Sequence, residues 1–347
     1  MTTTQPGPTE ATAQAMVAEG KGILAADESN GTMDKRLAPV LDAPPTEEDR
    51  RTFREVMFTT AGAEGHISGA ILYDETIRQS ASDGTPFPEL LNAQGIIPGI
   101  KVDTGAKALA GSPGEKVTEG LDGLRERLEE YHALGARFAK WRAVIAIGDG
   151  LPTSRCIEVN AHALARYAAL CQEADITPIV EPEVLMDGDH TIDTCDEVTQ
   201  RTLRVVFAAL ASQGVALEGM ILKPNMVLSG KDCGHQADVQ EVAARTLLCL
   251  RRVVPPAVPG ITFLSGGQSD EDATAHLAAM NAIGGQPWEL SFSYGRALQA
   301  TPLEHWRGRS ANVAAAQASY LELAQANGAA RHGRHERASE RAVAPAA

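Results

Sequence analysis

The sequence lacks the cysteine pattern of a disulfide-linked secreted protein. Its five cysteines are odd in number and include no C-x-x-C pair. The first residues contain no basic segment followed by an apolar one, and no apolar run reaches the length that spans a bilayer. The sequence therefore predicts no disulfide framework, signal peptide or transmembrane helix, and we expect a soluble cytoplasmic protein.

An excess of positive charge is also missing. Lysine and arginine number 31 against 45 aspartates and glutamates, which gives a formal net charge of −14. This balance repels nucleic acid and anionic membranes at long range, so neither is expected as a partner. It leaves room for a small anionic substrate, because a local cationic pocket can form on an acidic protein.

Motifs for metals and nucleotides are absent as well. The nine histidines show no H-x-H or H-E-x-x-H spacing. Asp187-Gly-Asp-His190 could supply ligands, but a simple turn explains it equally well. Lys231, in Ser229-Gly-Lys-Asp232, lacks the upstream glycine and the following hydroxyl residue of a P-loop. We expect no metal and no cofactor.

Short apolar runs that end in polar or glycine-rich residues recur along the chain, with helical spacing between most of them. The runs cover residues 22–27, 70–74, 96–102, 138–144, 176–181, 220–223, 261–265 and 290–293. Repeated strand–helix alternation favours an α/β fold closed into a (β/α)8 TIM barrel. An open doubly wound sheet would usually carry G-x-G-x-x-G after its first strand, and that fingerprint is missing.

The chain is expected to form one barrel domain over residues 1–330. Residues 8–18 are predicted to form an extra N-terminal helix, and residues 46–62 form another that begins at Thr46 as N-cap. Residues 331–347 show little apolar pattern and are expected to be a mobile C-terminal tail without a core to join.

Charged residues fall at or near the ends of several predicted strands. These residues are Asp27, Lys101, Lys140, Arg142, Glu181, Glu183 and Lys223. Catalytic residues of a barrel gather at the C-terminal ends of its strands, so these side chains are expected to meet at one mouth. Such a gathering forms either a catalytic site or an ion-pair network.

Lys223 ends the apolar strand of Gly219-Met-Ile-Leu-Lys223. Burial and a neighbouring cation, Lys140, would both disfavour its charged form and supply a neutral amine that attacks a carbonyl. A lysine that reaches solvent and has no chemical role is the alternative.

Glu181 and Glu183 flank Pro182 and require nearby cations unless one stays protonated; a carboxyl with a raised pKa could shuttle protons. The alternatives are ion pairs with Lys140 and Arg142, and for Asp27 a helix N-cap.

Glycine-rich segments follow the last two predicted strands. They are Ser265-Gly266-Gly267-Gln-Ser269 and Ser293-Tyr-Gly295-Arg296. Barrels often bind phosphate with these loops, where glycine lets the backbone approach an anion and arginine adds a forked donor. A second phosphate could be bound by Lys35 and Arg36 with Ser29 and Thr32, although a solvated helix face would explain this cationic pair equally well.

Several segments together resemble class I fructose-bisphosphate aldolase, in order from about residue 19 to 320. They are Gly22-Ile-Leu-Ala-Ala-Asp-Glu-Ser29, Phe138-Ala-Lys-Trp-Arg142, Ile179-Val-Glu-Pro-Glu183, Leu222-Lys-Pro-Asn-Met226, Phe263-Leu-Ser-Gly-Gly-Gln-Ser269 and Phe292-Ser-Tyr-Gly-Arg-Ala-Leu-Gln299. The resemblance implies a metal-independent, usually homotetrameric TIM barrel. Its expected activity is reversible cleavage of fructose 1,6-bisphosphate to dihydroxyacetone phosphate and glyceraldehyde 3-phosphate, in glycolysis and gluconeogenesis.

By the same resemblance, Lys223 forms the imine and Glu181 is the acid–base group. Asp27 takes the C4 hydroxyl proton, while Lys140 and Glu183 hold charge and position around Lys223. The positions that match the phosphate site nearest the imine are Ser265, Gly266, Gly295 and Arg296. Those that match the remaining substrate groups and second phosphate are Ser29, Thr32, Lys35, Lys101 and Arg142.

Two departures from the family pattern stand out. Thr32 replaces a serine found in many relatives and keeps the hydroxyl, and the chain ends without a terminal tyrosine. Two other functions stay open: a Schiff-base barrel enzyme for another phosphosugar, and a catalytically silent scaffold. The scaffold should have lost a lysine or carboxylate, and none is missing.

Overall fold

A computed structural model describes residues 6–335. Its parallel strands close into a barrel in the order β1-β10-β9-β8-β7-β6-β3-β2. The strands are β1 (Gly22–Ala25), β2 (Ile67–Leu72), β3 (Ile97–Lys101), β6 (Phe138–Ile145), β7 (Thr177–Val184), β8 (Ile221–Leu222), β9 (Gly260–Phe263) and β10 (Glu289–Tyr294). Each of the predicted apolar runs contains at least half of one of these strands, so the predicted barrel is confirmed.

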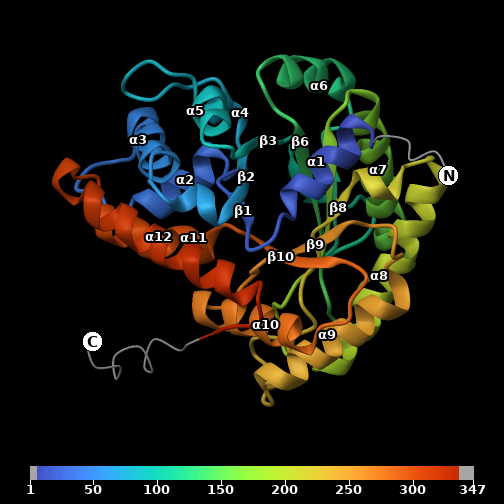
Figure 1. The fold of residues 1–347 in the computed structure, drawn as a ribbon. Coiled ribbons are helices and arrows are strands. Elements are labelled where there is room, and N and C mark those ends of the chain that lie inside the picture. Colours follow the sequence, from blue (N-terminus) through green and yellow to red (C-terminus); the bar gives the residue numbers. More distant parts are fainter. Residues whose placement is uncertain (1–5, 336–347) are drawn as a thin grey trace.

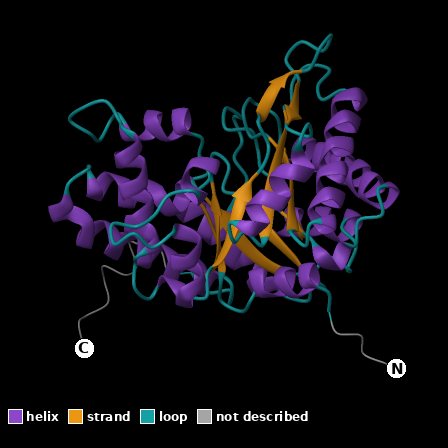
Figure 2. Cartoon of the chain, turned by 90° about the horizontal axis from the view of Figure 1, so that it is seen from above, coloured by secondary structure: helices purple, strands orange, loops and turns teal. Residues whose placement is uncertain are grey.

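Helices surround the strands on the outside of the barrel (Figures 1 and 2). They are α2 (Asn30–Leu37), α3 (Glu47–Phe58), α4 (Asp74–Ile77), α5 (Phe87–Ala93), α6 (Leu124–Ala133), α7 (Ser154–Glu173), α8 (Ile192–Ser212), α9 (Val239–Val253), α10 (Asp270–Ile283), α11 (Arg296–Trp306) and α12 (Val313–Ala330). The predicted N-cap of α3 is correct, since the Thr46 side chain accepts a hydrogen bond from the Asp49 backbone. None of these helices is both long and apolar enough to cross a lipid bilayer.

A short hairpin was not predicted from the sequence. Strands β4 (Gly105–Ala108) and β5 (Lys116–Glu119) pair antiparallel between β3 and α6. Their few residues are mostly polar or small, so they show no apolar alternation. The Thr118 hydroxyl donates to the Arg142 carbonyl oxygen at 2.7 Å and thereby fixes the hairpin beside β6.

The N-terminal helix α1 (Pro8–Met16) closes the N-terminal end of the barrel. Its residue Met16 and the following Val17 form one buried cluster with inward-facing strand residues such as Ile23 and Phe138. The Ser68 hydroxyl, near the start of β2, donates to the Met16 carbonyl oxygen at 2.5 Å. Figure 1 shows α1 against the strands. The predicted extra helix is confirmed, and it leaves the opposite, C-terminal end for a site.

The C-terminal boundary of the packed chain differs from the expectation. Arg331, placed by the sequence in a tail without a core, is 8% exposed. Its guanidinium donates to the carbonyl oxygens of Val17, Ala18 and Lys21 and forms an ion pair with Glu289 at 2.7 Å. Because Arg331 is held by hydrogen bonds and an ion pair, the spacing of apolar residues could not predict its burial. Residues 336 to 347 of the predicted tail lie outside the described residues.

Glycines make room for large rings inside the barrel. A Cβ at Gly99 would lie 2.2 Å from the Phe138 ring, and one at Gly69 would lie 2.9 Å from it. Phe138 is fully buried, so the ring has little space into which to move. The barrel interior therefore depends on a match between small residues on β2 and β3 and a large one on β6.

This match predicts that Gly99→Ala destabilises the protein by about 1–3 kcal/mol, because overpacking a dense core forces neighbouring side chains to shift. Phe138→Leu in the same chain should restore part of the loss. Gly31→Ala is the control, since nothing lies within 4 Å of a Cβ there and alanine favours α2. Thermal unfolding of the four proteins tests this. Equal melting temperatures for the Gly99 and Gly31 variants would contradict it.

Candidate active site

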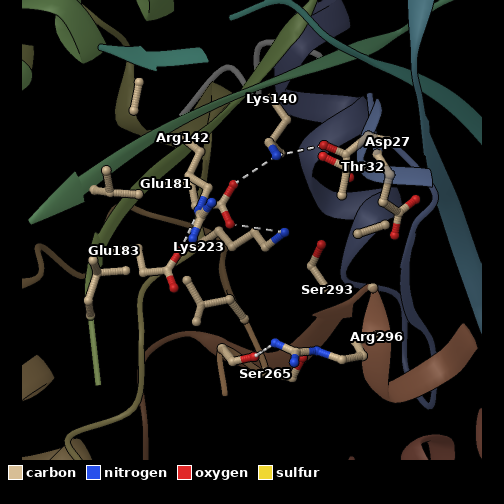
Figure 3. A pocket seen from close by; sticks show the side chains of 18 of the residues that line it. Asp27, Thr32, Lys140, Arg142, Glu181, Glu183, Lys223, Ser265, Ser293 and Arg296 are labelled. Atoms are coloured by element: carbon tan, nitrogen blue, oxygen red, sulfur yellow. Dashed lines mark hydrogen bonds and ion pairs between the residues drawn. The ribbon is translucent and has the colours of Figure 1, made fainter. Parts of the chain in front are cut away.

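A cavity of about 600 Å3 opens at the C-terminal ends of the barrel strands. Residues two apart on a strand point to the same side, which brings Lys140 and Arg142 of β6 and Glu181 and Glu183 of β7 into it. Figure 3 shows these side chains with Asp27 and Lys223 around a common space. The predicted convergence of charged strand ends is thus found.

Lys223 follows β8 directly and is held by its backbone N–H, which donates to the Val180 carbonyl oxygen at 2.9 Å. Its side chain is only 4% exposed, and its Nζ lies 3.3 Å from Glu181 Oε1. Burial lowers the pKa of Lys223 below its ordinary value; the charge of Lys140 acts in the same direction and that of Glu181 opposes it. The alternative of a lysine that reaches solvent is wrong.

Lys140 lies between two carboxylates. Its Nζ donates to Asp27 Oδ2 at 2.6 Å and lies 3.3 Å from Glu181 Oε2. Burial would lower the pKa of Lys140, but Asp27 and Glu181 more than compensate and raise it above its ordinary value. The two buried lysines therefore differ: Lys140 is held charged, while Lys223 is biased toward the neutral amine.

The carboxylates are held in their charged form. Burial alone would raise the pKa of Glu181, yet Lys140 and Lys223 lower it below its ordinary value. Asp27 is shifted in the same direction, since Lys140 and Lys223 outweigh its burial. The expectation that the Glu181 carboxyl has a raised pKa is therefore wrong. The alternative, that nearby cations stabilise its charge, describes the structure. Asp27 is no N-cap either, because Ser29 occupies that position of α2.

Among the described residues, Glu183 forms no ion pair with either buried lysine. It forms an ion pair with the Arg142 side chain, so for this carboxylate the ion-pair alternative describes the geometry. The backbone N–H of Arg142 also donates to Asp103 Oδ2 at 3.3 Å, and Lys101 Nζ lies 2.8 Å from Asp103 Oδ1. One buried carboxylate, Asp103, thus braces two cationic residues of the cavity wall.

The glycine-rich loops after β9 and β10 form the opposite wall. Gly266 has φ +57°, a left-handed conformation that favours glycine, and a Cβ at Gly267 would lie 2.8 Å from the Met186 sulfur. Arg296 Nη2 donates to the Gly266 carbonyl oxygen at 2.9 Å. The Ser293 hydroxyl is buried and has no hydrogen-bond partner within residues 6–335. These groups, together with Ser265 and Gly295, line the cavity.

Arg296 differs from every other cation that lines the cavity. Among the described residues it has no carboxylate within 4 Å, whereas each of the others has at least one. The pairs are Arg36–Glu28, Lys101–Asp103, Lys140–Asp27, Arg142–Glu183, Lys223–Glu181 and Lys231–Asp187. An unpaired guanidinium beside an unpartnered hydroxyl and tight glycine turns is suited to a bound anion.

Of the residues predicted to bind a second phosphate, only some line the cavity. Ser29, Thr32 and Arg36 line the cavity, and the hydroxyls of Ser29 and Thr32 lie 3.1 Å apart. Lys35 does not line it and is exposed on α2, because its neighbour Arg36 occupies the inward side of the helix. For Lys35 the alternative of a solvated helix face describes the structure.

Sequence reasoning missed four charged residues of the cavity: Glu28, Asp103, Asp187 and Lys231. Glu28 pairs with Arg36 and with the buried Arg54. Asp103 could have been found from its spacing, since it follows Lys101 by two residues. Lys231 lies in a segment that lacks the P-loop pattern, and no sequence signal places it or Asp187 at the cavity. Within residues 6–335 no group of three or more His, Cys, Asp or Glu side chains is arranged to hold a metal ion.

Comparison with known proteins gives a consistent result. The family model described as "Fructose-bisphosphate aldolase class-I" matches residues 9–346. A protein of Xanthomonas axonopodis pv. citri (strain 306), named "Probable fructose-bisphosphate aldolase class 1", is 60% identical over 324 residues, which cover 93% of this chain and 97% of that protein. Fructose-bisphosphate aldolase 1 of Toxoplasma gondii is 52% identical over 325 residues, 93% of this chain and 89% of that protein.

A solved structure agrees with these relatives. The fructose-bisphosphate aldolase of Plasmodium falciparum, in a ternary co-crystal with TRAP and a small-molecule inhibitor, is similar with a TM-score of 0.93 and 49% sequence identity, and the match covers 95% of each chain. Sequence and fold both match over nearly the whole length. The chain belongs to the class I fructose-bisphosphate aldolase family.

Proposed function

We propose that this chain cleaves fructose 1,6-bisphosphate to dihydroxyacetone phosphate and glyceraldehyde 3-phosphate, reversibly, through an imine on Lys223. The observation that carries the proposal is the buried group of Asp27, Lys140, Glu181 and Lys223, which lies in the same cavity as the unpaired Arg296. An amine biased toward its neutral form and an anion site together suit a phosphorylated ketose.

Imine formation needs a proton donor and acceptor beside the amine. Lys223 Nζ attacks the C2 carbonyl, and the resulting carbinolamine loses water when a proton reaches its hydroxyl group. Glu181, 3.3 Å from Lys223 Nζ, is the group that transfers protons in both steps. Its lowered pKa means that it first accepts a proton from the attacking amine and then passes it to the leaving hydroxyl.

Carbon–carbon cleavage then uses Asp27. As the C4 hydroxyl proton moves to the Asp27 carboxylate, the C3–C4 bond breaks, the C4 oxygen becomes the aldehyde, and the bond electrons pass into the iminium to give an enamine. Asp27 is available as a base because Lys140 holds it ionised. Protonation of the enamine at C3 and hydrolysis of the imine release dihydroxyacetone phosphate.

The two phosphates occupy different walls of the cavity. Arg296, with Ser265, Gly266, Gly267, Ser293 and Gly295, is suited to the phosphate nearest the imine. Ser29, Thr32, Arg36, Lys101 and Arg142 lie on the side suited to the other phosphate and the remaining hydroxyls. Glu183 holds Arg142 in place there. Among the groups expected from the family, only Lys35 has no place in this assignment.

The biological setting follows from the same proposal. We infer that the protein is a cytoplasmic homotetramer. It acts in glycolysis and gluconeogenesis and needs no metal or cofactor. A scaffold without catalysis is disfavoured because no catalytic group is missing. A different phosphosugar as substrate is disfavoured because two cationic walls face one cavity.

Lys223 is expected to carry the trapped substrate. Borohydride reduction with dihydroxyacetone phosphate should attach the ketose phosphate to Lys223, since that amine is buried and biased toward the neutral form. Peptide mapping by mass spectrometry locates the label, and Lys223→Met should abolish it. Recovery of the label on Lys140 or Lys101 would overturn the assignment.

Cleavage should not depend on a metal ion, because the iminium supplies the electron sink. Activity on fructose 1,6-bisphosphate is therefore expected to be unchanged in saturating EDTA. A steady-state assay before and after chelation measures this. Activity that disappears with EDTA and returns with zinc would contradict the imine mechanism.

Arg296→Ala should lower kcat/KM for fructose 1,6-bisphosphate at least about tenfold, since a charge-assisted hydrogen bond contributes about 1.5–3 kcal/mol. The loss should be mainly in KM. Arg252→Ala, on the exposed side of α9, is the control and should leave kcat/KM unchanged. An unaltered kcat/KM in the Arg296 variant would place the phosphate elsewhere.

A further inference from the structure

Lys231 lies in the cavity wall without a role in the proposed reaction. It belongs to the loop after β8 and lines the cavity together with Asp187 of the loop after β7. Its side chain is 53% exposed and pairs with Asp187, which is 63% exposed. Lys231 is also near enough to Arg296 for the guanidinium charge to act on it. It is therefore a movable cation beside the unpaired one.

The backbone that carries Lys231 is firmly held. The N–H groups of Gly230, Lys231 and Asp232 donate to carbonyl oxygens of the loop after β7 at 2.7, 2.8 and 2.9 Å. A Cβ at Gly230 would lie 2.4 Å from the Gly188 carbonyl oxygen, so only glycine permits this approach. The two loops form one rigid rim, and only the Lys231 side chain needs to move to reach a ligand.

The pair with Asp187 is easily exchanged. Exposed ion pairs contribute little, because water screens them and both side chains lose freedom. A phosphate group carries close to two negative charges and offers several acceptor oxygens, so it competes well with one carboxylate for an ammonium group. Lysine suits such an exchange, since its flexible stem presents three donors without a fixed plane.

We propose that Lys231 is a second cationic ligand of the phosphate bound at Arg296, and that it leaves Asp187 when the phosphate enters. Asp187 then acts as a competitor that keeps Lys231 poised at the rim of the empty site. This inference rests on the proposed function and extends it, since it names a residue that sets affinity for the phosphate nearest the imine.

The test is the dihydroxyacetone phosphate concentration that gives half-maximal borohydride trapping on Lys223. This ketose carries one phosphate and so reports on one site. Lys231→Met should raise that concentration about fivefold, with the maximal label unchanged, and Lys231→Arg should restore most of the affinity. In steady state KM for the bisphosphate should rise while kcat stays within about twofold. The effect should shrink at high salt, because exposed charges are screened.

Asp187→Asn separates this role from a structural one. Without its competitor Lys231 is free for the phosphate, so half-maximal trapping should occur at a lower concentration than in the unmodified chain. If Lys231 only braced the loop through Asp187, both variants would weaken binding alike, and the proposal would be overturned.

A matched control is available on the outside of the barrel. Arg125 and Glu173 form a similarly exposed pair, 56% and 58%, between α6 and α7. Arg125→Met removes the same charge far from the cavity and should not change trapping. Equal half-maximal concentrations for Lys231→Met and Arg125→Met would also overturn the proposal. Absence of any label on Lys223 in the unmodified chain would instead refute the imine mechanism, so the two failures can be told apart.

Discussion

The site depends on the burial of two lysines and two carboxylates in direct contact. Asp27, Lys140, Glu181 and Lys223 are nearly excluded from water, where an unpaired charge would be very unfavourable. The ion pairs within the group offset the cost of burying its charges. The pairs are unequally distributed: among the described residues, Lys140 contacts two carboxylates and Lys223 contacts one. This unequal division accompanies opposite shifts of the two lysine pKa values, that of Lys140 above its ordinary value and that of Lys223 below it, and the proposed imine chemistry on Lys223 depends on this difference.

The barrel exists to hold this arrangement rigid. Lys140 and Glu181 lie on adjacent strands, and Lys223 follows a two-residue strand hydrogen-bonded to β7. Because neighbouring strands fix their relative heights, the separations of the four charges are set by backbone pairing and not by flexible loops. The two cations nearest the proposed phosphate site lie outside the strands: Lys231 is on the loop after β8, and Arg296 is the first residue of α11.

Much of this could be predicted from the sequence, and the reasons differ by residue. Continuous apolar strands predict the barrel. Charged residues at the strand ends predict the site, because a barrel brings the C-terminal ends of its strands together. The sequence could not separate Lys35 from Arg36, since one residue of helix rotation decides which enters the cavity. Nor could it show that Arg331 is buried or that Lys231 reaches the rim, because both depend on contacts between segments far apart in the chain.

Helix α1 covers the N-terminal end of the barrel, so within residues 6–335 the cavity opens at the C-terminal end. In the proposed reaction, the substrate and both products then pass the same rim, which Lys231 and Arg296 border. In the proposed reaction, cleavage frees the aldehyde half while the ketose half is still covalently attached to Lys223. That covalent bond sets the order of release: the triose aldehyde departs first, and the ketose follows once its bond to the enzyme has been hydrolysed.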